Sequence, residues 1–264
     1  MRILIINLAQ CLDRRSFQEA QAERLGLEPT FLKACCKQEL EDATYHQFRH
    51  TWERPMSRGE VACFLSHRQG WAAVAESGEP ALILEDDTVL ADDIKGLLND
   101  LSGLAYAEKV NLGIRNQRKV VAREGKKMES ADYQLFRLHQ ERSGAHAYVL
   151  WPEGATKLLK LFDKKASLAD KAFGHSSLIQ YQIEPAAAVQ TGDCQKWAIP
   201  DELNVSSTID GVPRTVAGLP LKTALAIKTR RFCSHFTVLR NRLCCLFSGT
   251  KRAIAVDPNR FTVS

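Results

Sequence analysis

The chain has 264 residues, of which 45% are hydrophobic and 25% charged, a composition typical of a globular protein with a sizeable core. No apolar run approaches the roughly 18 residues that cross a bilayer, which argues against an integral membrane protein. Eight cysteines occur without any CxxC pair, so we expect neither a zinc site nor a disulfide framework, and reduced thiols in the cytosol.

The formal net charge of +5 is unevenly distributed along the chain. Residues 214–264 contain ten Lys and Arg and one Asp, whereas residues 1–213 contain 26 basic and 30 acidic residues. Within 221–247, basic and bulky apolar residues mix in a helix-compatible pattern. Such a segment binds the surface of an anionic membrane, or it packs on the body with its basic face in solvent, and both interpretations stay open. We do not expect nucleic-acid binding, because no recognised module accompanies the charge.

Strands and helices alternate along the chain. The pattern predicts strands at 3–8, 31–34, 81–84, 109–112, 133–138 and 145–150, and helices at 13–25, 57–76, 92–102 and 154–162. The apolar run after Met1 is too short for a signal peptide, so we expect a buried first strand there. Gly26 and Gly78 are expected to end the first two helices. Residues 36–56 are predicted to be irregular or partly helical, and the polar stretch 116–130 to be a mobile loop.

This alternation predicts an α/β fold with a mostly parallel, twisted sheet covered by helices on both faces. We expect one domain over residues 1–200, followed by a basic, partly helical segment over 201–264.

Three consecutive acids, Glu85, Asp86 and Asp87, follow the predicted strand at 81–84. In open α/β sheets, ligands bind just outside the carboxyl ends of the strands. Mutual repulsion of the acids predicts a positive group beside them, and oxygen ligands suit Mg²⁺ or Mn²⁺, which usually arrive with phosphates. Asp86 is expected to point away from its neighbours, since side chains alternate along a strand. A solvated acidic turn is the alternative.

The predicted helix at 57–76 carries Glu60 and His67 seven residues apart, near one face. An acid and an imidazole on one face can act as a base or bind hydroxyl groups. A buried pair of Ser66 and His67, satisfied by its surroundings, is the alternative.

Several segments recur in a characteristic order: Asn7-Leu8 with Asp13-Arg14-Arg15, Gly59-Glu60-x-x-Cys63-x-x-Ser66-His67, Leu84-Glu85-Asp86-Asp87, Gly144-Ala145 through Tyr148, Gly154-Ala155 with Leu158-Leu159, Asp170, and Pro185 through Gln190. This series resembles that of glycosyltransferase family 25, which includes bacterial lipooligosaccharide galactosyltransferases and is similar to the collagen galactosyltransferases. The resemblance covers about residues 1–192. Its strongest part is the second and third segments, which lie roughly twenty residues apart.

The resemblance implies a GT-A-like domain that binds a nucleotide sugar. It also implies an inverting transfer of a hexose, usually galactose from UDP-galactose in β linkage, to a sugar hydroxyl of a lipooligosaccharide or lipopolysaccharide. A divalent cation, Mn²⁺ or Mg²⁺, held by Asp87 and Glu85 would neutralise the diphosphate of the leaving group. The residues expected to bind the donor are Asn7, Leu8, Arg14, Glu85, Asp86 and Asp87.

Inversion also needs a carboxylate base for the acceptor hydroxyl. Asp170 matches the family's acidic position and is the first candidate, with a helix cap as its alternative role; Glu60 is the second candidate. Ser66 and His67 are assigned to acceptor binding or structural support. The chain departs from the family pattern at Cys35-Cys36-Lys37, where a glycine-containing turn is usual, and it lacks a proline before Asp170.

Together these features predict a UDP-sugar-dependent glycosyltransferase that acts on a glycolipid or oligosaccharide acceptor. The basic segment would place it peripherally on the cytoplasmic face of the inner membrane. The alternatives are a catalytically inactive nucleotide-sugar-binding or scaffolding protein of the same fold, a transferase using another UDP-sugar, and a nucleotidyltransferase or phosphatase using the same acids.

Overall fold

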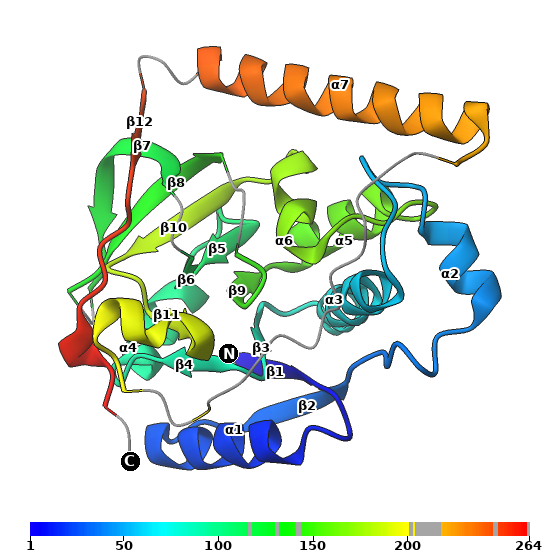
Figure 1. Ribbon diagram of the computed structural model, residues 1–264. Helices are drawn as coiled ribbons and strands as arrows, with labels where there is room; N and C mark the ends of the chain where they lie inside the picture. Colours follow the sequence, from blue (N-terminus) through cyan, green and yellow to red (C-terminus); the bar gives the residue numbers. More distant parts are fainter. Residues whose placement is uncertain are drawn as a thin grey trace.

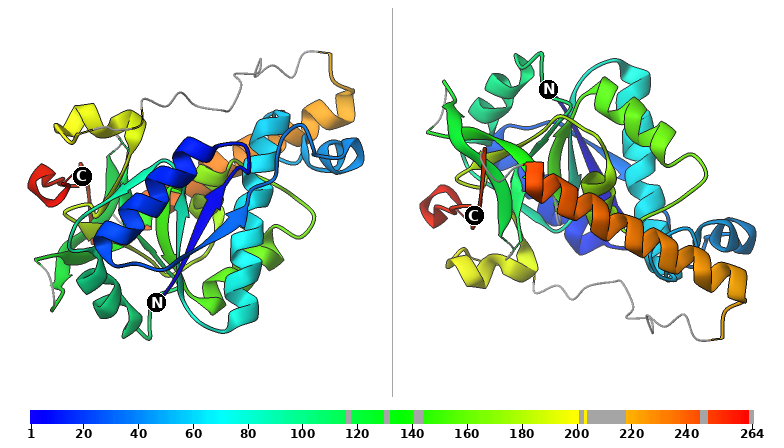
Figure 2. Two further views of the ribbon diagram at one scale, coloured as in Figure 1. Left: turned by 90° about the horizontal axis from the view of Figure 1, so that it is seen from below. Right: turned by 90° about the horizontal axis from the view of Figure 1, so that it is seen from above.

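The computed structural model describes residues 1–115, 118–129, 132–140, 144–200, 203, 218–244 and 248–262. Within them, a nine-stranded sheet runs through the molecule and helices cover both of its faces (Figures 1 and 2). A second sheet of three short strands lies beside it. The predicted α/β class is therefore confirmed. In the described part of the chain, no helix is both long and apolar enough to cross a membrane.

The first part of the chain forms a parallel unit with β1 in its centre. Its elements are β1 (Arg2–Asn7), α1 (Leu12–Leu25), β2 (Pro29–Lys33), α2 (Asp42–Phe48), α3 (Arg58–Ser77) and β3 (Ala81–Glu85). Strand β1 pairs in parallel with both β2 and β3. Gly26 and Gly78 end α1 and α3 in the left-handed region, with φ of 61° and 69°, as predicted. The carboxyl ends of β1 and β3 therefore meet at one edge of the sheet.

The second part is largely antiparallel. Its elements are β4 (Thr88–Leu90), α4 (Ile94–Ser102), β5 (Lys109–Asn111), β6 (Gly113–Ile114), β7 (Lys119–Lys127), β8 (Gln134–Gln140), β9 (Ala147–Leu150), α5 (Pro152–Leu161), α6 (Ala169–Ala172), η1 (Phe173–His175), β10 (Gln180–Glu184), β11 (Ala188–Gln190), η2 (Thr191–Trp197), α7 (Leu221–Cys244), β12 (Gly249–Arg252) and η3 (Pro258–Arg260). The sheet order is β12-β7-β8-β10-β5-β9-β3-β1-β2.

The prediction of a mostly parallel sheet is wrong. Of the strand pairs described in the nine-stranded sheet, only β1–β2, β1–β3 and β5–β10 are parallel. Strand β9 lies between β3 and β5 and runs antiparallel to both, and β7 and β8 pair as neighbours joined by a short connection. Short connections favour antiparallel pairing, whereas parallel strands need a crossover of a dozen residues or more.

The prediction of a mobile loop over 116–130 is also wrong for the described residues of that stretch. Residues Lys119–Lys127 form strand β7, and residues 116, 117 and 130 lie outside the described part. The second half of β7 is exposed, which explains its polar sequence. Gly125 allows the β7 backbone to approach β8, because a Cβ atom there would lie 2.8 Å from the ring of Phe136.

Alternation along β1 and β3 produces a core on each face of the sheet. Ile3, Ile5, Leu82 and Leu84 pack in one core, which also contains the buried face of α4. The intervening strand residues point into the other core, beneath α3 and α5. These two cores fix the ends of β1 and β3, where the acidic segment begins.

Helix α7 crosses one end of the molecule (Figures 1 and 2). Arg230 and Arg231 donate hydrogen bonds from α7 to the carbonyl oxygens of His50 and Glu53, at 2.7 and 3.0 Å. The chain then returns to the body, where β12 pairs with β7 and Phe261 is buried in the core. Residues 201, 202, 204–217 and 245–247 of the predicted basic segment lie outside the described part.

Candidate active site

The three acids diverge where β3 turns into β4. The Glu85 amide donates to the carbonyl oxygen of His146 at 2.8 Å, so the turn is anchored to the start of β9. The Asp86 side chain is 8% exposed, whereas those of Glu85 and Asp87 are 24% and 19% exposed. Asp86 is thus the most buried of the three acids, and it lies with Asp87 in the turn that follows β3.

Asp86 ties the acidic turn to β1 and α1. Its carboxylate accepts a hydrogen bond from Asn7 Nδ2 at 2.9 Å and an ion-paired one from Arg14 Nη1 at 2.8 Å. Arg14 also lies 3.6 Å from Asp87 Oδ2. Asn7, Arg14 and Asp86 are therefore brought together, as predicted for a shared site, and Arg14 adds a positive charge between two acids.

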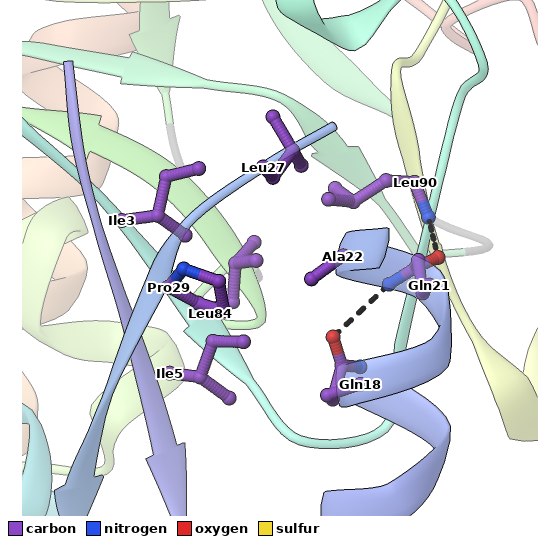
Figure 3. A pocket seen from close by; sticks show the side chains of 9 residues that line it. All are labelled: Ile3, Ile5, Gln18, Gln21, Ala22, Leu27, Pro29, Leu84 and Leu90. Carbon is purple, nitrogen blue, oxygen red and sulfur yellow. Dashed lines mark hydrogen bonds between the residues drawn. The ribbon is translucent and has the colours of Figure 1, made fainter. Parts of the chain in front are cut away.

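Two buried glutamines on α1 hold the same turn through its backbone. Gln18 Nε2 donates to the carbonyl oxygens of Asp86 and Thr88, at 3.1 and 2.8 Å. Gln21 accepts a hydrogen bond from the Leu90 amide at 2.8 Å, which Figure 3 shows. The small cavity beside them is lined chiefly by apolar side chains (Figure 3), so it is unsuited to a charged nucleotide.

Glu85 and Asp87 share one hydrogen-bond donor. Gln190, the last residue of β11, donates from Nε2 to Glu85 Oε2 at 2.9 Å and to Asp87 Oδ1 at 3.1 Å. Burial, together with the charge of Glu85, raises the pKa of Asp87 from its ordinary 3.8 to about 7. Two carboxylates that share one neutral amide donor offer oxygen ligands of the kind that a divalent cation prefers.

Asp170 lies at the other end of this network. Its carboxylate accepts an ion-paired hydrogen bond from Arg115 Nη1 at 2.8 Å, and Arg115 Nε donates to Gln190 Oε1 at 2.9 Å. Gly144 and Ala145 offer their amides to Asp170 Oδ1, at 3.4 and 3.3 Å. Burial acts to raise the pKa of Asp170, but Arg115, His146 and the two amides outweigh it and hold the pKa below its ordinary value. Asp170 does not cap α6, so that alternative role is wrong.

A family model described as "Glycosyltransferase family 25 (LPS biosynthesis protein)" matches residues 1–173. The chain belongs to glycosyltransferase family 25. The matched region contains every site residue described above except Gln190, and the family is the one that the resemblance predicted.

Two curated relatives are similar to parts of this family-25 chain. Procollagen galactosyltransferase 2 of Homo sapiens is 28% identical over 177 residues, which cover 60% of this chain and 27% of that protein. A glycosyltransferase 25 family member of Aedes aegypti is 34% identical over 95 residues, which cover 32% of this chain and 16% of that protein. The chain therefore spans about a quarter or less of the length of these relatives.

Glu60 lies apart from the acids of this family-25 site. Its carboxylate accepts hydrogen bonds from Arg54 Nη1 and from the Ser57 amide, both at 2.9 Å, and the Ser57 hydroxyl accepts from the Glu60 amide. Burial acts to raise the pKa of Glu60, but Arg54 and Ser57 have a larger, opposite effect. The pKa of Glu60 therefore lies below its ordinary value. Glu60 thus forms the capping box that begins α3, which the sequence analysis did not foresee.

Ser66 and His67 have different surroundings. The Ser66 hydroxyl donates to Ala62 O at 2.9 Å and accepts from the Cys35 amide at 2.8 Å, which gives it a structural role. His67 Nε2 lies 3.2 Å from Glu85 Oε1 and therefore faces the site. Leu8 follows β1 and packs against the core beneath α3.

Three residues of the network were missed by the sequence analysis, namely Arg115, His146 and Gln190. Gln190 entered only as the end of a matched segment, and Arg115 borders the stretch predicted to be a loop. His146 is 1% exposed, and neither ring nitrogen has a hydrogen-bond partner among the described residues. Its ring is seated against Gly113, where a Cβ atom would lie 2.0 Å from Nε2, and burial lowers its pKa to about 4. The spacing between Gly113 and His146 gives no sequence signal for this contact.

Proposed function

We propose that the protein is an inverting galactosyltransferase that moves galactose from UDP-galactose, in β linkage, to a sugar hydroxyl of a lipooligosaccharide or lipopolysaccharide. The name of the human relative supports galactose, and the family description supports the acceptor. The observation that carries the proposal is the Glu85–Asp87 pair at the carboxyl end of β3, bridged by Gln190.

The pair fits a hard divalent cation. Its donor atoms are carboxylate oxygens, and both side chains remain partly accessible. Burial, and after it the charge of Glu85, raises the pKa of Asp87, and a divalent cation would offset both effects. Glu85 and Asp87 would hold Mn²⁺ or Mg²⁺, and such an ion neutralises the diphosphate of a departing UDP. Arg14 would add positive charge on the α1 side.

The remaining donor-binding residues lie around that pair. Asp86 orients Arg14 and Asn7 through the hydrogen bonds described above, so its own contribution is to hold the donor-binding groups in place. Asn7 ends β1 next to the acidic turn and Leu8 follows it, and we propose that the two contact the uridine of the donor.

We propose Asp170 as the base that takes the proton of the acceptor hydroxyl during in-line attack. Its lowered pKa keeps it ionised at neutral pH. The Arg115–Gln190 link holds it at a fixed position relative to Glu85 and Asp87. Glu60 is the weaker candidate, because its carboxylate closes the capping box that begins α3, whereas Asp170 is linked through Arg115 and Gln190 to Glu85 and Asp87.

The exposed apolar residues of helix α7 support binding of the protein to a membrane surface. Leu221, Leu225, Phe232 and Phe236 are 62–83% exposed, and at 100° per residue they fall within a stripe roughly 60° wide. Ile227, on the opposite side, is buried. We propose that this stripe and its basic neighbours bind an anionic lipid surface at the cytoplasmic face of the inner membrane, where a glycolipid acceptor would be presented.

The test is donor turnover. The protein is incubated with Mn²⁺, a saccharide acceptor and each of UDP-galactose, UDP-glucose and other UDP-sugars, and UDP release and the product linkage are measured. We expect release from UDP-galactose, a β-linked product, and loss of both with EDTA or in Asp87→Ala. The exposed Asp163→Ala is the matched control and keeps activity. Release of UDP from another donor but not from UDP-galactose would contradict galactose as the transferred sugar. Binding of a donor without release of UDP would indicate an inactive nucleotide-sugar-binding protein.

A further inference from the structure

A cysteine, a histidine and a glutamate converge at the edge of the candidate active site. The ligand atoms of Cys63, His67 and Glu85 all lie within 4.8 Å of one another, and they form the one such group of three among the described residues. His67 Nε2 and Glu85 Oε1 are 3.2 Å apart. A tetrahedral zinc ion with bonds of about 2.0–2.3 Å separates its ligand atoms by about 3.5 Å, so the cluster needs only a small shift of the thiol.

The local sequence explains why these groups meet. Cys63 and His67 are four residues apart on α3 and so lie on one face of the helix, the spacing that helical metal sites use. On that face, His67 contacts Glu85, the last residue of β3. Cys63 is a free thiol. The transfer proposed above uses neither the Cys63 thiol nor the His67 imidazole.

The second ring nitrogen of His67, Nδ1, also has a hydrogen-bond partner, as in metal-ligating histidines. His67 Nδ1 lies 3.1 Å from the Tyr148 hydroxyl, which in turn accepts a hydrogen bond from Trp71 Nε1 at 3.0 Å. A hydroxyl both donates and accepts, so Tyr148 can accept a hydrogen bond from His67 Nδ1–H, which leaves the Nε2 lone pair for an ion. Ligating histidines almost always have such a partner at their second nitrogen.

The types of ligand atom indicate which metal ion would bind. One sulfur, one imidazole nitrogen and one carboxylate oxygen suit Zn²⁺ and its spectroscopic substitute Co²⁺, whereas Mg²⁺ and Mn²⁺ prefer oxygen ligands. Burial raises the pKa of the Cys63 thiol well above its ordinary value, and a coordinating zinc ion displaces the thiol proton regardless. We propose that Cys63, His67 and Glu85 form a second metal site, which binds Zn²⁺ and thereby inhibits transfer.

Inhibition follows because Glu85 belongs to both sites. Its Oε1 lies 3.2 Å from His67 Nε2. Its Oε2 accepts a hydrogen bond from Gln190, which also donates to Asp87. An ion bound to Oε1 weakens the negative charge available to a cation at Glu85 and Asp87, and the two cations repel each other across one carboxylate. The inhibition rests on the proposed transferase function, whereas zinc binding does not.

Binding is tested without any activity measurement. Co²⁺ is added to the full chain, and the sulfur-to-cobalt charge-transfer band in the near ultraviolet is recorded, followed by its displacement with Zn²⁺. We expect one equivalent of Co²⁺ to give the band in the wild type and in Cys233→Ser, whose cysteine is exposed on α7, and no band in Cys63→Ser. An absent band in the wild type, or an unchanged band in Cys63→Ser, would overturn the site.

Inhibition is tested separately with Mn²⁺-supported UDP release. We expect Zn²⁺ to inhibit the wild type and Cys63→Ser to need at least about tenfold more Zn²⁺ for the same inhibition, with basal activity retained. Equal inhibition of both proteins would mean that Zn²⁺ acts at the Glu85–Asp87 pair, which overturns the regulatory proposal. If no UDP is released with any donor, the proposed function fails while the cobalt spectrum still decides the metal site.

Discussion

Gln190 Nε2 lies 2.9 Å from Glu85 Oε2, although the two residues are 105 positions apart in the chain. The same amide reaches Asp87, and its oxygen accepts from Arg115. One neutral side chain therefore spaces two carboxylates and connects them to the arginine that holds Asp170. We regard Gln190 as the centre of the site.

We expect Gln190→Ala to lower the rate of UDP release roughly 10- to 100-fold, the usual cost of removing a group that orients metal ligands. The loss should be accompanied by weaker Mn²⁺ binding, because Glu85 and Asp87 lose their common donor. Steady-state kinetics against Mn²⁺ concentration provide the measurement. Gln134→Ala, at an exposed position of β8, is the control; a wild-type Mn²⁺ dependence in Gln190→Ala would contradict this role.

Asp87 is expected to destabilise the metal-free protein at neutral pH. Its pKa is about 7 in the folded state against an ordinary 3.8, so the folded state binds the proton more tightly, and the free energy of unfolding falls as pH rises from about 4 through 7. Asp87→Asn removes this loss and should be more stable than the wild type by about 4 kcal/mol at pH 8, with almost no gain near pH 4. Thermal unfolding in EDTA at the two pH values checks it, and a gain that is equal at both would refute it.

Substitutions of Asp170 and Glu60 should have different effects, the first on the transfer rate and the second on stability. Asp170→Asn is expected to lower the transfer rate about 100-fold or more while donor affinity stays near the wild-type value, because the base acts on the acceptor. Glu60→Gln weakens the capping box and the Arg54 ion pair, so we expect a loss of about 1–2 kcal/mol in unfolding free energy and little change in rate. Kinetics and denaturant unfolding of both variants decide the assignment. A larger rate loss in Glu60→Gln would reverse it.

The exposed stripe of α7 should govern attachment to lipid. We expect Leu225→Ser with Phe232→Ser to reduce cosedimentation with anionic vesicles while activity on a soluble saccharide is unchanged. Leu12→Ser, which alters an exposed apolar residue on α1, is the matched control. Added salt should weaken the wild-type association, since the basic residues contribute through charge. Unaltered cosedimentation of the double variant would remove the stripe from the membrane site.

Local chemistry made the first part of the fold predictable. Gly26 and Gly78 mark helix ends through a backbone conformation that glycine adopts readily. Family motifs predicted that Asn7, Arg14, Glu85 and Asp170 would share a site, and the structure brings them together. These features depend on residues close in sequence or on a known motif order.

Long-range pairing explains what was missed. The antiparallel insertion of β9 between β3 and β5 leaves no local pattern, and β7 looked like a loop because much of it faces solvent. Arg115 and Gln190 belong to different segments that meet only in the folded sheet. Glu60 is the opposite case: its partners, Arg54 and Ser57, are local, and a helix cap competes for the same carboxylate that a catalytic base would need.

The return of the chain from α7 into β12 has a mechanical consequence. Because β12 is hydrogen-bonded to β7, and because Ile254 and Phe261 after it are buried in the core, α7 is a bridge between two anchored parts of the chain and not a free arm. Its contacts to His50 and Glu53 add a third attachment near α3. A lipid surface seated on α7 would therefore meet the protein in one orientation, which sets the height and tilt at which an acceptor glycan must reach Asp170.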